Sequence, residues 1–390
     1  MTAKSKNAME FFNTDFTVFG APGRYIQGVG VLDLVGLCCA TLASTAVLLC
    51  DKTVAGLIEG RVVASCRSAG VALSVIDFNG EIDASTGPSL ARSIDAATKP
   101  IIIAAGGGRT IDAGKALRDE VGGALLTLPT VASNDSPTSK NYVLYDADHR
   151  LIAVRHMPSN PDFVLVDTAL IAGSPKAFFL AGLGDAIAKK FEADRCFAAG
   201  GPTMFRARST RTARAIANEC YRQLILNAAD AYSVAGSGNP TEAFDAAVEA
   251  MILMAGLAFE NGGLSIAHAL TRGLSNVRGA CKAPHGLQVA YGLLVQLQLE
   301  GNGYPDDLLA LYQATGLPTS LVDLSLVDVS DDDLLTIAEP SALVAHTANF
   351  SRPVTAQDLM FAMSAVEARF SRQNDVNAAS QSYGQTQQTA

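Results

Sequence analysis

The strongest local signal in the chain is a glycine-rich segment that could bind phosphate. Residues 101–105 (IIIAA) form a short apolar run, three glycines follow at 106–108, and a helical pattern begins at once. Glycine lets a backbone come close to a pyrophosphate, and the free N–H groups at a helix start give it a positive field. Close packing alone can also require such glycines, and the segment lacks the GxGxxG fingerprint. We interpret residues 106–110 as a candidate dinucleotide-phosphate loop.

Two further segments carry polar side chains after apolar runs. Asp51 follows the run 45–50, where a carboxylate can accept hydrogen bonds from the ribose 2′-hydroxyl of NAD and would repel the 2′-phosphate of NADP. A helix cap is the alternative role for Asp51, and Lys52 beside it weakens the charge argument. Residues 128–139 (LPTVASNDSPTS) place hydroxyl groups, an amide and one carboxylate after another strand pattern, where open α/β sheets bind ligands. These residue types are also ordinary turn formers.

Asp185, His268 and His285 are candidates for a metal site. Asp185 lies in AGLGDAIA and His268 in GGLSIAHAL, and a carboxylate among such small and apolar residues is costly to bury unless it meets a cation or several donors. Two histidines and one carboxylate form a catalytic zinc set that leaves one position open for water or substrate. A structural role is the alternative for each histidine alone. We interpret Cys281, four residues before His285, as structural rather than as a competing soft ligand.

The composition limits the class of protein. The chain has 390 residues, of which 49% are hydrophobic and 17% charged, so it can bury large cores and is not wholly disordered. A net charge of −9 without a basic tract leads us to expect no nucleic-acid partner. The uncharged stretch 34–50 is short and has acidic flanks, which favours a buried helix and strand over a membrane span. The absence of a signal-peptide pattern and seven scattered cysteines without CxxC favour a cytoplasmic protein.

The secondary structure that the sequence predicts changes near residue 170. Before it, strand patterns alternate with helical patterns, which predicts a largely parallel sheet. The expected strands are 45–50, 71–78, 100–105, 124–128, 142–145, 151–154 and 163–166, and the expected helices include 32–43, 54–69 and 112–120. Later runs have helical spacing only. We expect an α/β dinucleotide-binding domain, an all-helical domain with the ligand cleft between the two, and a polar disordered tail, at 1–170, 171–372 and 373–390.

Taken in order, these motifs resemble the glycerol dehydrogenase branch of the iron-containing alcohol dehydrogenase superfamily. The similarity covers residues 17–370, and the ordered series is more specific than any single motif. Its marks are PGRYIQG at 22–28, GGGRTIDAGK at 106–115, PTVASNDSPTS at 129–139, LVDT at 165–168, GLGD at 182–185, ENGG at 260–263, AHA at 267–269, and HG at 285–286 followed by VAYG at 289–292. The resemblance implies the dehydroquinate synthase-like fold, with an α/β NAD-binding domain before an all-α metal-binding domain.

The resemblance also implies an activity and a set of site residues. It implies oxidation of glycerol to dihydroxyacetone with NAD, by a homo-oligomer that in this branch is often an octamer. One zinc ion per chain would be held by Asp185, His268 and His285, which with Asp135 would bind the substrate. Asp135 matches the polyol-contacting position and is our catalytic candidate. The NAD-contacting positions match Asp51, Gly106, Gly107, Gly108, Arg109, Thr110, Thr130, Val131, Ala132, Ser133, Ser139, Asn141 and Tyr145.

Three departures from the family pattern bear on this site. Iron-dependent relatives have a further histidine four residues after the metal aspartate, where this chain has Lys189, a change that favours zinc over iron and alters the charge of the site. After the last metal histidine the family often has Glu-Lys, whereas this chain has Leu287 and Gln288. Asn141 and Tyr142 replace a usual Leu-Ser pair. These changes bear on substrate choice more than on fold or cofactor.

The expected mechanism is metal-assisted hydride transfer from an alcohol to NAD. Zinc would bind the alcohol oxygen and lower the hydroxyl pKa, while Asp135 and neighbouring hydroxyl groups orient the rest of the polyol. One alternative is a dehydrogenase of the same scaffold that acts on another diol or a 2-hydroxy acid. Another is an NAD- and zinc-using cyclase resembling 3-dehydroquinate synthase, whose phosphorylated substrate should require more basic residues. A binding module without catalysis would need ordinary partners for Asp185 and both histidines.

Overall fold

A six-stranded parallel sheet forms the first half of the chain in the computed structural model, which describes residues 15–95, 98–146 and 151–370. The expected tail 373–390 lies outside the described residues. The strand order is β1-β8-β5-β4-β2-β3. The strands span Arg24–Gly28 (β1), Thr45–Cys50 (β2), Ala72–Asp77 (β3), Ile101–Gly106 (β4), Leu125–Pro129 (β5) and Phe163–Asp167 (β8). Since β4, β5 and β8 are buried along their whole length, the sheet is covered on both faces, as parallel sheets require.

The order of the strands reverses between β2 and β4. β2 pairs with β3 on one side and with β4 on the other, and the later strands β5 and β8 extend the sheet away from β4. Open α/β sheets bind ligands outside the carboxyl ends of their strands at such a reversal. Asp51 directly follows β2, and the glycines 106–108 run from the last residue of β4 into the first residue of α4, so the two segments singled out in the sequence flank this point.

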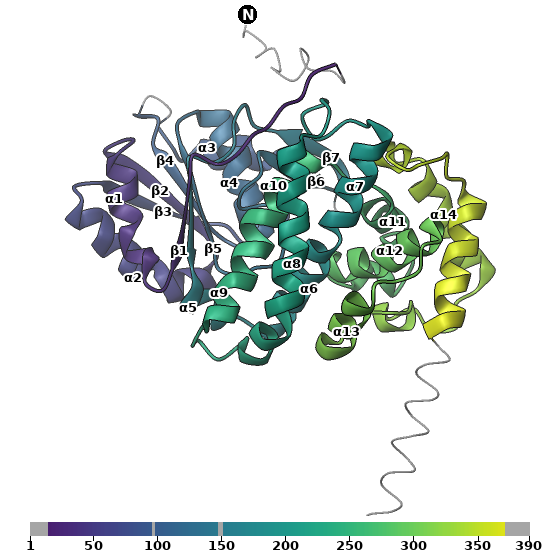
Figure 1. Cartoon of the computed structure of the whole chain (residues 1–390). Helices are drawn as coiled ribbons and strands as arrows, with labels where there is room; N and C mark the ends of the chain where they lie inside the picture. Colours follow the sequence, from purple (N-terminus) through teal and green to yellow (C-terminus); the bar gives the residue numbers. More distant parts are fainter. Residues whose placement is uncertain (1–14, 96–97, 147–150, 371–390) are drawn as a thin grey trace, which may run out of the picture.

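Helices cover both faces of the sheet (Figure 1). They are α1 (Val35–Ala40), α2 (Lys52–Ser68), α3 (Thr86–Ala91) and α4 (Gly108–Val121), with a 3-10 turn, η2, at Val31–Leu34. The expected helix 32–43 is therefore a 3-10 turn followed by a short helix, and it leads into the buried strand β2. None of the helices in the described ranges is long and apolar enough to cross a membrane.

The hairpin after β5 corrects one sequence-based expectation. Residues 142–145 and 151–154 do form strands, β6 (Asn141–Tyr145) and β7 (Leu151–His156), but they pair antiparallel in a separate two-stranded sheet. β7 alternates poorly and is mostly exposed, so it lacks the continuous apolar character of a central parallel strand. β1 was not expected because its sequence, RYIQG, is short and mixes charged and polar residues with two apolar ones. It lies at the sheet edge, paired with β8 alone.

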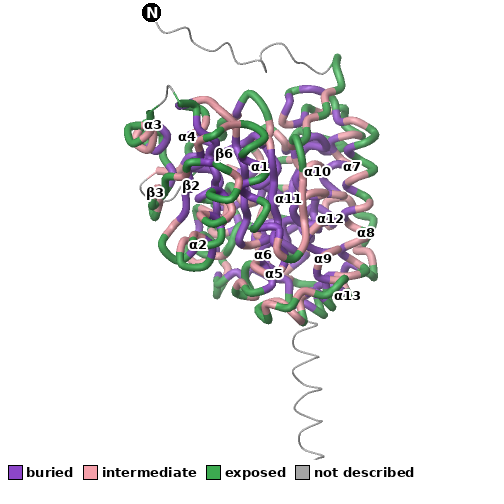
Figure 2. The backbone as a smooth tube through the Cα atoms, turned by 90° about the vertical axis from the view of Figure 1, so that its left-hand side faces the viewer, coloured by how far each residue is buried: buried purple, intermediate pink, exposed green. Residues whose placement is uncertain are grey.

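From Thr168 onward the named elements are helices, as the spacing of apolar residues predicts. The labelled α-helices are α5 (Thr168–Ala172), α6 (Lys176–Ile187), α7 (Lys189–Ala199), α8 (Arg211–Val234), α9 (Glu242–Glu249), α10 (Ala255–Gly262), α11 (Ile266–Leu274), α12 (His285–Glu300), α13 (Asp306–Thr315) and α14 (Asp331–Ala342), and residues 356–370 are helical as well. A π-helical turn, η4 (Ala250–Met254), joins α9 to α10, and short 3-10 turns are η5 (Ala280–Lys282), η6 (Val322–Leu324) and η7 (Ala345–Ala348). Figure 2 shows buried backbone running through both halves of the molecule.

Glycines let the two halves pack backbone against backbone around α6. A side chain on Gly182 would collide with the carbonyl oxygen of Ala132, which lies in the loop after β5. A side chain on Gly286, at the start of α12, would collide with the carbonyl oxygen of Ala181. The small residues of the GLGD segment thus bring the β5–β6 loop, α6 and the start of α12 into direct contact. That contact places Asp185 beside residues that are distant in the sequence.

We expect Gly182→Ala to lower the free energy of unfolding by about 1–3 kcal/mol, because the added methyl group overpacks a contact between two backbones. Gly56→Ala in the exposed face of α2 is the matched control, since no neighbouring atom lies within 4 Å of the place that a methyl group would take there. That change should stabilise the protein by up to about 1 kcal/mol through helix propensity. Urea unfolding measures both. Equal effects of the two substitutions would contradict the packing argument.

Candidate active site

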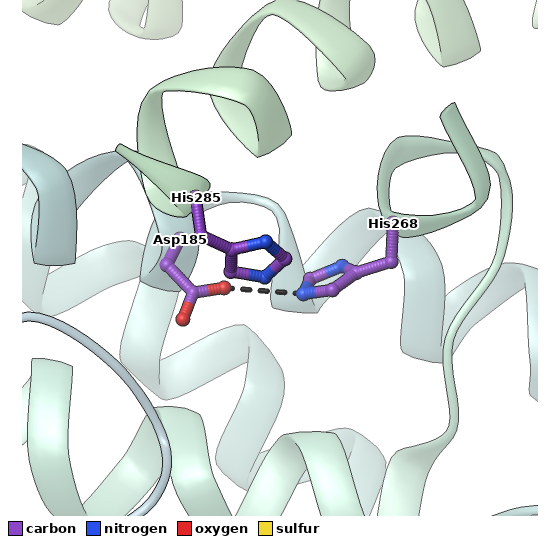
Figure 3. A group of neighbouring side chains, drawn as sticks. All are labelled: Asp185, His268 and His285. Carbon is purple, nitrogen blue, oxygen red and sulfur yellow. Dashed lines mark hydrogen bonds and ion pairs between the residues drawn. The ribbon is translucent and has the colours of Figure 1, made fainter. Parts of the chain in front are cut away.

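The three predicted metal ligands come together in the helical half. Asp185 comes from α6, His268 from α11, and His285 is the first residue of α12 (Figure 3). One ligand atom from each lies within 4.8 Å of the others. Asp185 and His268 are buried, whereas His285 is exposed, so the group opens to solvent on the side of His285. The centroids of the two imidazole rings are 5.5 Å apart.

The side chain of Lys189 lies among these groups. It follows Asp185 by one helical turn, because α6 and α7 meet at Ala188, whose backbone is helical. Its Nζ atom is 2.7 Å from Asp185 Oδ1 and 3.0 Å from His268 Nε2. The third neighbour of Nζ is Asp135 Oδ2, at 2.7 Å. Burial alone would lower the pKa of Lys189, but the two carboxylates outweigh it and hold the pKa above its usual value.

The donor types at this centre suit zinc, but their arrangement does not fit a metal ion. Asp185 Oδ1 already accepts an N–H group of Lys189, and His268 Nε2 lies 3.0 Å from Lys189 Nζ and 3.1 Å from Asp185 Oδ1. A zinc ion would need the same atoms at about 2.0–2.2 Å and would lie beside a buried ammonium that repels it. Asp185, His268 and His285 can hold a metal only if the Lys189 side chain leaves the position it occupies in this structure.

Glu192, which the sequence analysis did not single out, holds His268 in place. Its Oε2 atom lies 2.6 Å from His268 Nδ1, and its Oε1 atom accepts the backbone N–H groups of His268 and Ser265. Burial raises the pKa of Glu192, but His268 outweighs it and the pKa falls to about 2. The spacing of Asp185, Lys189 and Glu192 puts three charges on one face of an otherwise apolar segment, and that pattern could have revealed Glu192 from sequence.

Asp135 brings the loop after β5 into the same centre. Its Oδ2 atom pairs with Lys189, while its Oδ1 atom is buried and has no hydrogen-bond partner in the described part of the chain. Burial, followed by the charge of Asp185, raises the pKa of Asp135 to about 6. A buried acceptor without a donor is costly, so this oxygen is suited to take a hydrogen bond from a bound ligand.

The predicted phosphate loop, Gly106–Thr110, forms a glycine-lined cradle where the start of α4 meets the loop after β5. Gly107 is the N-cap of α4, and no side chain caps that helix start. A side chain on Gly108 would collide with the amide of Asn134, so glycine allows the loop after β5 to come close. The backbone N–H of Thr130 donates to the carbonyl oxygen of Gly106 at 3.1 Å and ties the two loops together. Val131, Ala132 and Ser133 continue this second loop.

Asp51 and Arg109, at the edge of the cradle, have protein partners. Asp51 caps α2 by accepting the N–H of Val54 at 2.9 Å, which is the alternative that the sequence analysis left open. Lys52 lies 3.9 Å from the exposed Asp77, so its charge is directed toward β3. Arg109 pairs with Glu81 at 2.8 Å. Thr110 is buried in the first turn of α4.

Ser139 and Asn141 are tied to a buried lysine. The Nζ atom of Lys115, a fully buried residue of α4, lies 2.6 Å from the Asn141 carbonyl oxygen and 3.4 Å from Ser139 Oγ. The Asn141 side chain contacts His156 through its oxygen, while its Nδ2 atom is buried without a partner in the described residues. Tyr145 is half-buried at the end of β6. Lys115 thus links α4 to Ser139, just before the hairpin, and to Asn141 at its start.

The other departures from the family pattern have structural partners. Gln288 donates to the carbonyl oxygens of Ala280 and Ala283 and anchors the segment that leads to His285. Leu287 packs against the core of the helical half. Tyr142 donates to Asp119. Cys281 is exposed and does not belong to the group of possible metal ligands.

The chain is similar in sequence and in structure to known dehydrogenases and to a reductase. The sequence profile of the family "Iron-containing alcohol dehydrogenase" matches residues 22–168. A glycolaldehyde reductase of Halobacterium salinarum is 34% identical over 333 residues, which are 85% of this chain and 91% of that protein. A glycerol dehydrogenase of Escherichia coli is 33% identical, with 85% and 90% covered. The crystal structure of glycerol dehydrogenase from Schizosaccharomyces pombe superposes with a TM-score of 0.88 at 29% identity, covering 94% of each chain.

We expect Glu192→Gln to lower kcat/KM by about 10–100-fold, as is usual when a residue that orients an active-site imidazole is changed. An amide nitrogen facing Nδ1 would favour the His268 tautomer with a proton on Nε2, and that proton would face the N–H groups of Lys189. Steady-state rates measure the effect, and NADH binding serves as the control because Glu192 lies on α7, away from the cradle. Unchanged kcat/KM would contradict this role.

Proposed function

Because this chain belongs to the iron-containing alcohol dehydrogenase family, in its glycerol dehydrogenase branch, we propose that it oxidises glycerol to dihydroxyacetone with NAD. The observation that carries the choice of a polyol is the unpartnered Oδ1 atom of Asp135, buried beside the ammonium of Lys189. A polyol has a second hydroxyl group that can donate to this oxygen while its reacting hydroxyl lies at the cation. A simple alcohol has no such second donor.

The reversal point of the sheet would hold the cofactor. We assign the pyrophosphate to the start of α4 and the segment Gly106–Thr110, where free N–H groups and the helix dipole favour negative charge. Asp51 would accept the ribose hydroxyl with the carboxylate oxygen that does not cap α2. When bound, NAD supplies the hydride acceptor. Thr130 and Ser133 of the β5–β6 loop, with Ser139, Asn141 and Tyr145 of the following hairpin region, complete the proposed contact set.

The loop after β5 and the helical half together would position the substrate. Asp135 accepts a neighbouring hydroxyl, and the exposed edge of His285 provides the way in from solvent. Glu192 fixes the ring of His268, so the centre is rigid before substrate arrives. The zinc ion that the sequence predicts on Asp185, His268 and His285 does not fit beside Lys189, so no step is assigned to it.

Reduction of a small hydroxyaldehyde is the second candidate, because a glycolaldehyde reductase is among the similar proteins. Such a substrate also pairs a reacting oxygen with a neighbouring hydroxyl group, so Asp135 would serve both. A 2-hydroxy acid would bring a carboxylate next to Asp135 and Asp185, where like charges repel. A phosphorylated substrate, as in a dehydroquinate synthase-like cyclase, would meet the same repulsion.

We also propose that the chain acts as a cytoplasmic homo-oligomer. Large apolar side chains stand exposed on its C-terminal part, including Leu343, Phe361 and Val327, which are 86%, 72% and 66% exposed. Exposed apolar groups of this kind contribute to an interface where they lie together on one surface. A second copy of the chain is the simplest such partner.

We expect the purified protein to reduce NAD with glycerol. Asp135→Asn should lower kcat/KM for glycerol by about 100-fold, because the amide oxygen stays with the Lys189 ammonium and the NH2 group, a donor, replaces the acceptor Oδ1 that faces the substrate hydroxyl. With 2-propanol, which lacks a second hydroxyl group, the same substitution should have a smaller effect. Initial rates of NADH formation measure both substrates.

Asp194→Asn, on the far side of α7 where it pairs with Lys190, is the matched control and should retain the parent rates. Equal losses with glycerol and 2-propanol would contradict the role of Asp135 in polyol recognition. If neither glycerol oxidation nor glycolaldehyde reduction occurred, the proposed activity would be wrong.

A further inference from the structure

We propose that Lys189 is the resident cation of the active site, standing where a divalent metal would bind, and that this chain therefore works without a metal ion. The proposal rests on the proposed dehydrogenase function, since it names the group that carries positive charge in that reaction. It departs from the metal site that the resemblance implies. The observation behind it is the position of Nζ among Asp135, Asp185 and His268.

The surroundings of Nζ match the bonding capacity of an ammonium. A lysine ammonium has three N–H donors and no acceptor. Nζ has three acceptors within hydrogen-bond distance: a carboxylate oxygen of Asp135 at 2.7 Å, one of Asp185 at 2.7 Å and His268 Nε2 at 3.0 Å. His268 Nε2 also lies 3.1 Å from Asp185 Oδ1; when the Nδ1 proton is directed to Glu192, the Nε2 lone pair of the neutral ring faces Lys189. Each of the three N–H donors of the ammonium thus has an acceptor, as expected for a lysine that belongs to the site.

The charges of Asp135 and Asp185 also disfavour the displacement of the Lys189 ammonium by a metal ion. Asp135 and Asp185 are both buried, and Lys189 is 1% exposed, so the carboxylates depend on this cation for compensation. A buried carboxylate left without its partner is strongly destabilising. The ammonium is tethered one helical turn from Asp185, whereas a metal ion must come from dilute solution. A divalent ion would have to break three hydrogen bonds of Lys189 before it could use the same atoms.

The ammonium can perform the electrostatic task of a metal in alcohol oxidation. The substrate oxygen takes the N–H that now points to His268 Nε2, the longest of the three contacts. The hydroxyl group loses its proton to solvent at the exposed edge beside His285. The carbon-bound hydrogen then leaves with its electron pair to the nicotinamide ring, and the carbon–oxygen bond becomes a carbonyl. Lys189 stabilises the negative charge that develops on the oxygen.

The first test measures metal content and metal dependence of the full-length protein. Elemental analysis after dialysis should find far less than about one zinc ion per chain, and added zinc should bind weakly, because Lys189 occupies the ligand atoms. Glycerol-dependent NAD reduction should persist after treatment with a chelator. About one tightly bound zinc per chain, with activity lost on chelation and restored by zinc, would overturn the proposal.

The second test uses two adjacent lysines of α7. Lys189→Met keeps length but removes charge, and we expect kcat to fall by at least about 100-fold with NADH affinity retained, since one electrostatic contact to the reacting oxygen is lost. Lys190→Met is the matched control, because Lys190 pairs with Asp194 outside the centre. If Lys189→Met kept kcat within about threefold of the parent, the ammonium would have no catalytic task.

A third measurement does not depend on activity. Lys189→Ala frees Asp185 Oδ1 and His268 Nε2, and it should bind zinc at least about tenfold more tightly than the parent, measured by competition with a chromogenic chelator. Equal zinc affinity would overturn the proposal. Should Lys189→Ala fail to fold, the metal content and chelator response of the parent protein still decide. If no alcohol or aldehyde is converted, the function is wrong, while the zinc affinities still test Lys189.

Discussion

The pairing of one buried ammonium with two buried carboxylates is the interaction on which the site depends. Asp135 comes from the loop after β5, whereas Asp185 and Lys189 come from consecutive turns of α6 and α7. Neither carboxylate is tolerable in such surroundings without a cation. The ion pairs therefore join the sheet half to the helical half, and they do so at the point where the sheet offers its ligand-binding edge.

Close backbone packing makes that pairing possible. Gly182 and Gly286 allow α6 to touch both the β5–β6 loop and the start of α12, and Gly108 allows the same loop to approach α4. A methyl group at any of these positions would push apart elements that carry Asp135, His285 or the proposed phosphate cradle. The need for close contact between backbones thus explains the glycines in these segments.

The sequence predicted the fold better than the arrangement of the site. Short continuous apolar runs predicted β2, β4, β5 and β8 closely, because a strand that is buried on both faces has apolar residues at successive positions. It did not predict the edge strand β1 or the separate β6–β7 hairpin, whose pairing depends on tertiary contacts rather than on local pattern. The group of Asp185, His268 and His285 was also anticipated. The spacing showed that Lys189 was near Asp185, but not that its Nζ atom would also lie within hydrogen-bond distance of Asp135 and His268.

The direction of the Lys189 side chain depends on residues that are distant in the sequence. A residue at i+4 on a helix lies beside residue i, so Lys189 had to be close to Asp185. Whether it turned outward or inward depended on Asp135 and His268, which are 54 and 79 positions away from it. A second acidic residue arriving from the sheet half makes the inward position favourable, because it doubles the compensating charge. The inward position of the Lys189 ammonium therefore depends on Asp135, and the same residue supplies the oxygen suited to a polyol hydroxyl. Cation and substrate preference are linked through one side chain.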